Sequence, residues 1–206
     1  MAFYPCLQAV STPAPSTLPS IDLLQSYTTS GASNYTVTEN GTYLFIVSNS
    51  LSGSRSITLP QGRTAIVNEA VETTYGMTVV IAELQANDVV ELSATPDQWN
   101  AYSKQVYKVE DLTSFSVVGS QANNDGHYTY SLPSAGQYLL ISLCFGRTVS
   151  DYYDESDILL MPYILYNNTN ILTLTKICYG NLTTVPEQAL YGYDGGGVCF
   201  LALSVS

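Results

Sequence analysis

Short apolar stretches separated by turn residues follow one another along most of this chain. Apolar and polar residues alternate in some stretches, and others are continuously apolar with many β-branched and aromatic residues. Both patterns are typical of β-strands, and their close spacing favours a sandwich or barrel. No amphipathic helix of ten or more residues is predicted, and Asn40-Gly41 indicates a hairpin-type turn. The predicted strands cover residues 35–38, 42–48, 55–59, 77–84, 88–92, 102–109 and 197–205.

The first 33 residues differ from the rest of the chain. Residues 11–20 (STPAPSTLPS) are rich in proline, serine and threonine, which disfavours both a central strand and a helix. After them, Ser20 could cap one or two helical turns through Ile21, Leu23 and Leu24. We therefore expect an extended N-terminal arm at residues 1–33 that docks the protein onto a partner.

The remaining sequence contains a weak internal repeat. Segment 41–48 (GTYLFIVS) returns as 136–143 (GQYLLISL), which aligns Gly41 with Gly136 at an offset of 95 positions. Segment 88–92 (DVVEL) aligns with 170–174 (NILTL), which places Asp88 on Asn170 and makes the second copy 13 residues shorter in between. Each copy closes on a further strand. The order of these matches predicts two tandem antiparallel β-sandwich modules at 34–110 and 111–206, with one larger irregular sandwich as the alternative.

Three short motifs carry a resemblance to a known family. Residues 41–45 (GTYLF) resemble the Gly-x-Tyr-x-Phe motif of the jelly roll shared by complement globular heads and tumour-necrosis-factor-like cytokines. Residues 87–92 (NDVVEL) resemble its Gly-Asp-x-Val-x-Leu strand, although Asn87 stands where that motif has glycine, and residues 195–201 (GGGVCFL) resemble its closing strand. The resemblance implies jelly-roll modules and a homotrimer. Similar jelly rolls occur in bacteriophage head fibres, capsid decoration proteins and tail tips.

Composition narrows the possible partners. Only 11% of the residues are charged, and the formal net charge is −11 with six scattered basic residues. No basic stripe exists that could neutralise phosphates, so neither nucleic acid nor a membrane surface is an expected partner. The N-terminus lacks the charged and apolar regions of a signal peptide, and we expect a protein made in soluble form and located in a virion.

Few residues suggest chemistry. His127 lies in a turn-like stretch without a nucleophile motif, so we expect it to be structural and the protein not to be an enzyme. The acidic stretch from Asp151 to Asp157 could hold calcium, but it lacks the glycine and the final glutamate of an EF-hand loop. No cofactor or metal is predicted. Cys144, Cys178 and Cys199 lie in apolar runs and are interpreted as buried thiols, with a Cys144–Cys199 or Cys178–Cys199 disulfide as the alternative.

Tyrosine is the most suggestive residue type, with 17 copies. Exposed tyrosines can anchor a protein interface or stack on sugar rings. The candidate recognition surface comprises Tyr152, Tyr153, Tyr191 and Tyr193. The sequence thus predicts a virion structural protein. Its expected partners are further copies of itself and other virion proteins. The alternative is a tail module that binds a host receptor or glycan through these tyrosine-rich loops.

Overall fold

The fold is taken from a computed structural model of the chain. It describes residues 19–50, 53–72, 75–95, 102–123, 130–146, 159–160, 164–168, 171–185 and 197–206. All regular structure in these residues is β, and none of them is helical, which confirms the all-β expectation. The strands form three antiparallel sheets, which we call A, B and C.

Sheet A has five strands in the order β1-β8-β3-β6-β5. Its central strand, β3, carries the continuously apolar run that the sequence indicates, and it pairs with β8 on one side and β6 on the other. The strands are β1 (Ser20–Tyr27), β3 (Gly41–Ser50), β5 (Ala65–Glu72), β6 (Tyr75–Leu84) and β8 (Tyr102–Glu110).

Sheets B and C complete the fold. Sheet B is a small sheet in the order β2-β7-β4, and sheet C has the order β11-β13-β10-β14-β9 with β12 paired to β13. Sheet B contains β2 (Gly31–Thr36), β4 (Arg55–Thr58) and β7 (Val89–Ala94). Sheet C contains β9 (Phe115–Asn123), β10 (Tyr130–Gly146), β11 (Leu159–Leu160), β12 (Ile164–Asn168), β13 (Ile171–Val185) and β14 (Gly197–Val205).

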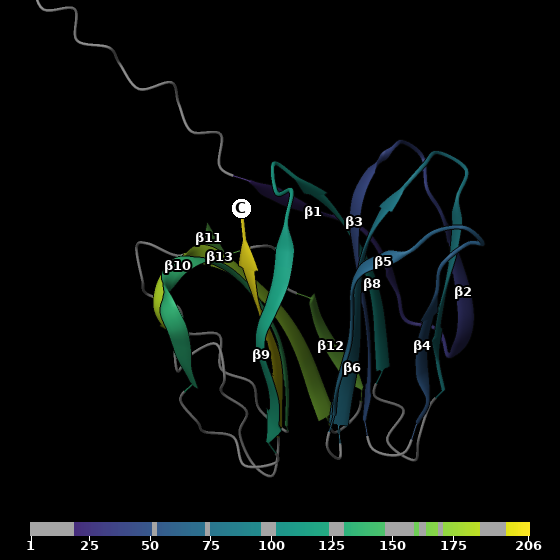
Figure 1. The fold of residues 1–206 in the computed structure, drawn as a ribbon. Coiled ribbons are helices and arrows are strands. Elements are labelled where there is room, and N and C mark those ends of the chain that lie inside the picture. Colours follow the sequence, from purple (N-terminus) through teal and green to yellow (C-terminus); the bar gives the residue numbers. More distant parts are fainter. Residues whose placement is uncertain are drawn as a thin grey trace, which may run out of the picture.

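The three sheets stack as layers, with sheet A between the other two (Figure 1). Alternation along β3 sends Leu44 and Ile46 towards sheet C, and Tyr43, Phe45 and Val47 towards sheet B. Both faces of sheet A are therefore buried, which explains why β3 reads as one apolar run rather than as an alternating strand.

Sheets A and C share one plan. β1-β8-β3-β6-β5 in sheet A matches β9-β14-β10-β13-β11 in sheet C, strand for strand and in the same sequence order. Tyr43 on β3 pairs with Lys108 and Ala82, and Tyr138 on β10 pairs with Ser204 and Gly180. Equivalent residues of these two strand sets lie 92 to 98 positions apart. Gly41 and Gly136 therefore occupy the same place in the two sheets.

The two strand sets also share a β-bulge in their edge strands. The pairing of β1 with β8 skips Leu24, and the pairing of β9 with β14 skips Val118 at the equivalent position. A β-bulge places one extra residue on one strand and changes which face the following residues occupy. Its presence at the same point of both edge strands ties β1 and β9 together as counterparts.

An approximate twofold relation links the two sheets. β8 lies against β13, where Gln105 Nε2 donates to Thr175 Oγ1 at 3.0 Å, and β6 contacts β14. Because β6 corresponds to β13 and β8 to β14, these two contacts are counterparts of each other. Equivalent side chains therefore meet in one core. Its matched pairs include Ile21 and Phe115, Leu44 and Leu139, Ile46 and Ile141, Val79 and Ile177, and Tyr107 and Leu203.

Three local expectations from the sequence are wrong. Ser20 does not cap a helix, because residues 20–27 form β1 and pair with β8. Asn40-Gly41 does not close a hairpin, since β2 pairs with β7 and β3 pairs with β6 and β8.

The alignment of Asp88 with Asn170 fails as well. The strand that follows Asp88 is β7 in sheet B, whereas the strand that follows Asn170 is β13, the counterpart of β6. Because the offset between the two strand sets is nearly constant, the second copy is not 13 residues shorter than the first, as the sequence alignment had implied.

Candidate functional site

The residues proposed for recognition lie outside the described part of the chain. This holds for Tyr152, Tyr153, Tyr191 and Tyr193, for the acidic stretch 151–157 and for His127. Their roles stay predictions. The described residues offer other polar features, which the sequence did not single out.

Of the cysteines, Cys199 bears out the buried-thiol interpretation, because it is fully buried in the core between sheets A and C. The strand that carries Cys178, β13, is separated from β14 by β10, so the two backbones lie about 10 Å apart. A disulfide needs Cα atoms within about 7 Å, which excludes a Cys178–Cys199 bridge. The side chain of Cys144 lies outside what the structure describes, so a Cys144–Cys199 bridge stays an open alternative.

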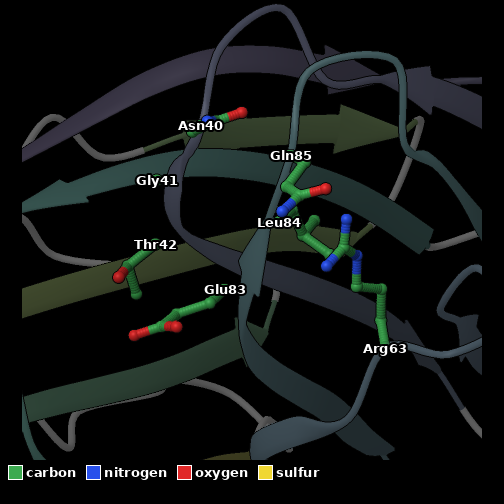
Figure 2. A pocket seen from close by; sticks show the side chains of 7 residues that line it. All are labelled: Asn40, Gly41, Thr42, Arg63, Glu83, Leu84 and Gln85. Atoms are coloured by element: carbon green, nitrogen blue, oxygen red, sulfur yellow. The ribbon is translucent and has the colours of Figure 1, made fainter.

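A cavity of about 400 Å³ lies at one end of sheet A, just beyond the point where β5 stops pairing with β6. Three separate stretches of chain bring its residues together: the start of β3, the loop before β5 and the end of β6 with the turn that follows it. The lining residues are Asn40, Gly41, Thr42, Arg63, Glu83, Leu84 and Gln85 (Figure 2).

Hydrogen bonds that the Asp88 carboxylate accepts fix the turn beside this cavity. Its Oδ2 accepts the backbone N–H of Gln85 at 2.8 Å and Nε of Arg63 at 2.7 Å. The Gln85 N–H, helped by Arg63, holds the pKa of the Asp88 carboxyl below its usual range. Asn40 Oδ1 accepts the N–H of Ala86 at 2.9 Å, which ties the loop before β3 to the same turn.

Asn87 makes this turn possible. Its φ is 73°, in the left-handed region that glycine and asparagine tolerate best. This is the position at which the resembled motif has glycine, so the departure in sequence is compatible with the backbone. The N–H of Asn87 donates to the carbonyl oxygen of Val37 at 2.8 Å, which anchors the turn against sheet B.

Two buried basic side chains hold sheet B onto sheet A. Lys104 Nζ donates to the carbonyl oxygen of Gly31 and to Ser33 Oγ, both at 2.8 Å, and lies 5.9 Å from the ring centre of Tyr27. Its side chain is buried, and desolvation lowers its pKa. Arg55 on β4 bonds Asn49 and Glu72 through its two Nη atoms, while its buried Nε has no hydrogen-bond partner among the described residues.

A polar network interrupts the apolar core between sheets A and C. Gln105 bonds Thr175, and its Oε1 accepts the hydroxyl of Tyr107 at 2.7 Å. Ser48 and Ser103 share a hydrogen bond of 2.7 Å next to it. Burial raises the pKa of Tyr107 well above its usual range, so its hydroxyl stays a donor.

The cavity and the two basic tethers were not predicted from the sequence. Near Arg63, Gly62 with a φ of 85° and the Gln85–Asp88 turn are local signals. Both mark turns, but neither says that the two turns meet. The pairing of β6 with β3 on one side and with β5 on the other brings Asn40, Arg63 and Gln85 to one end of the sheet.

Comparisons with known proteins add no assignment: no family model, curated protein or solved structure matches this chain. The described residues contain no group of three or more His, Cys, Asp or Glu side chains placed to hold a metal ion. Nor does this part of the chain hold a helix that is long and apolar enough to cross a membrane.

Proposed function

We propose that this chain is a virion structural protein, an oligomeric β-sandwich accessory that decorates a phage capsid or forms a short fibre or adaptor. The observation that carries the proposal is the core shared by sheets A and C, in which two equivalent strand sets pack as one body. A body of this kind suits a protein that presents surfaces to its neighbours. The resemblance of residues 41–45 and 87–92 to jelly-roll motifs and the low charge content support the same role.

The N-terminal segment is the proposed attachment device. Residues 20–33 of the predicted arm belong to β1, β2 and the turn between them, so the docking part narrows to the residues before Pro19. β1 is an edge strand of sheet A, which places the start of the described chain at a border of the molecule. In this role residues 1–18 bind another virion protein, and the sheets project from the particle.

Subunit contacts are proposed at the two equivalent edge strands. Leu24, the bulged residue of β1, is 41% exposed, and Val117, which precedes the bulged Val118 of β9, is 42% exposed. A bulge blocks continuous pairing with a further strand, so we expect contact through these side chains rather than through a shared sheet.

Light scattering on the purified chain tests the oligomer, for which we propose a homotrimer. Leu24→Asp combined with Val117→Asp should shift the mass towards the monomer, because an apolar contact would then bury carboxylates. Val89→Asp, at a site that is 44% exposed on sheet B, is the matched control and should leave the mass unchanged. A monomeric parent chain would refute the homo-oligomer.

Particle binding tests the role itself. Mass spectrometry of purified particles from the source of this chain should detect it, and a chain that begins at Pro19 should no longer attach. A full-length chain with residues 1–18 in shuffled order controls for length. Equal attachment of all three chains would overturn the docking role of the N-terminal segment, and absence of the protein from particles would overturn the virion role.

A further inference from the structure

The cavity at the end of sheet A is lined mainly by polar groups. Leu84, which is 2% exposed, and the backbone of Gly41 form the inner part, while the side chains of Asn40, Glu83 and Gln85 are exposed around it. Its volume of about 400 Å³ falls in the range of small-molecule sites, about 300–1,000 Å³. The space is therefore large enough for a small ligand that keeps part of its surface in solvent.

The rim carries one positive and one negative side chain together with neutral polar groups, so it has no excess of either charge. Arg63 supplies N–H donors, Glu83 supplies acceptor oxygens, and Thr42, Asn40 and Gln85 can both donate and accept. An anion would meet the Glu83 carboxylate and a cation would meet the Arg63 guanidinium. A neutral ligand that carries several hydroxyl groups matches this mixture, since each hydroxyl both donates and accepts.

The rim is held in place before any ligand arrives. Arg63 reaches Asp88 through Nε, which orients the guanidinium group, and in Figure 2 that group points towards Leu84 and Gln85. Thr42 and Glu83 are opposite each other across the β3–β6 ladder, and their side chains lie together in the same view. Preorganised polar groups lower the entropic cost of binding.

The second strand set keeps the framework but not these groups. Gly136 takes the place of Gly41, yet Ala135 stands where Asn40 would be, and Gln137 and Asn181 replace Thr42 and Glu83. The core pairs of the two sets match one another, whereas this rim differs. The polar rim is thus a feature of the first strand set, separate from what the shared fold requires.

We propose that this cavity binds a carbohydrate unit. The sugar ring lies over the backbone of Gly41, and its hydroxyls bond to Arg63, Glu83, Thr42 and the amides of Asn40 and Gln85. The inference goes beyond the virion role and does not depend on it, because a sugar site could serve any surface protein of this fold.

Two-dimensional amide NMR spectra of the full chain provide the test, with glucose, galactose and N-acetylglucosamine as neutral probes. Phosphate and glutamate serve as an anionic and a zwitterionic probe. At least one sugar should shift the amide signals of Gly41, Thr42 and Gln85 in a saturable way. Sugar binding that leaves these three signals unmoved, or shifts from the charged probes alone, would overturn the proposal.

Variants locate the binding. Thr42→Val removes a hydroxyl and should weaken sugar binding roughly tenfold, and Glu83→Gln removes the charged acceptor and should weaken it less; both keep the shape of the side chain. Thr36→Val and Glu91→Gln make the same changes at exposed sites on sheet B and should leave the affinity unchanged. Equal affinity in all four variants would contradict the site, and the spectra themselves report whether each variant is folded.

Discussion

Tyr43 and Tyr138 make the same hydrogen bond in two different sheets. Each hydroxyl donates at 2.8 Å to the carbonyl oxygen four residues earlier, of Glu39 in one case and Ser134 in the other. Each ring also lies over a glycine two positions before it, Gly41 or Gly136. The Gly-x-Tyr motif thus fixes the start of the regular pairing of the central strand in both strand sets.

This equivalence predicts matched costs for removing the two hydroxyls. Tyr43→Phe and Tyr138→Phe should each lower the free energy of unfolding by about 1 kcal/mol, the usual value of one such hydrogen bond. Urea titrations of both variants and the parent measure the difference. A loss in one strand set with none in the other would show that the motif has different roles in the two sheets.

The polar network between sheets A and C predicts a coupled effect. Gln105→Leu leaves the hydroxyls of Tyr107 and Thr175 buried without their partner and should cost about 2–3 kcal/mol. Adding Tyr107→Phe should recover part of this loss, because the second strand set has leucine at both equivalent positions, Leu201 and Leu203. A double-mutant cycle measures the coupling, and strictly additive losses would contradict the network.

Lys104 predicts a pH dependence. Burial lowers its pKa in the folded protein, so the unfolded chain binds more protons between that lowered pKa and the ordinary lysine value. Stability attributable to Lys104 should therefore rise as the pH is raised from neutral through this window. Urea titrations of the parent and Lys104→Met, compared at several pH values, isolate the effect. A parent-minus-variant difference that stays flat or falls with pH would be the contrary result.

Asp88 predicts a loss of stability at acidic pH. Its pKa is lowered in the folded protein by the Gln85 N–H and by Arg63, so its stabilising effect is present above the ordinary carboxyl pKa. It is lost as the pH falls through the lowered value. Asp88→Asn should destabilise the protein at neutral pH, and the gap to the parent should close in acid. Thermal unfolding at neutral and acidic pH tests this, and a gap that is the same at both would contradict it.

Strand prediction from the sequence succeeded where burial on both faces left a plain signal. β3, β6, β8 and β14 are apolar or alternating runs bounded by turn residues, and each was predicted. β1 was missed because Ile21, Leu23 and Leu24 fit a helical spacing as well as a strand. Its pairing with β8 decides the matter. β9 was missed because the bulge at Val118 breaks the alternation that would reveal a strand.

Long-range pairing explains the remaining errors. Segments 88–92 and 170–174 have similar local patterns, yet one joins sheet B and the other pairs with β10. Nothing within five residues encodes that choice. The cavity was unpredictable for the same reason, since Arg63 and Asp88 are 25 positions apart and meet only through the sheet.

We infer that sheets A and C unfold as one cooperative body made of two equivalent strand sets. Native-state hydrogen exchange of the β3 and β10 amides tests it most directly, because it measures the opening free energy of each sheet separately. The shared core predicts equal opening free energies for the most protected amides of both strands, equal also to the global free energy of unfolding. A clearly lower value for one sheet would show two modules that unfold independently, and would contradict the account.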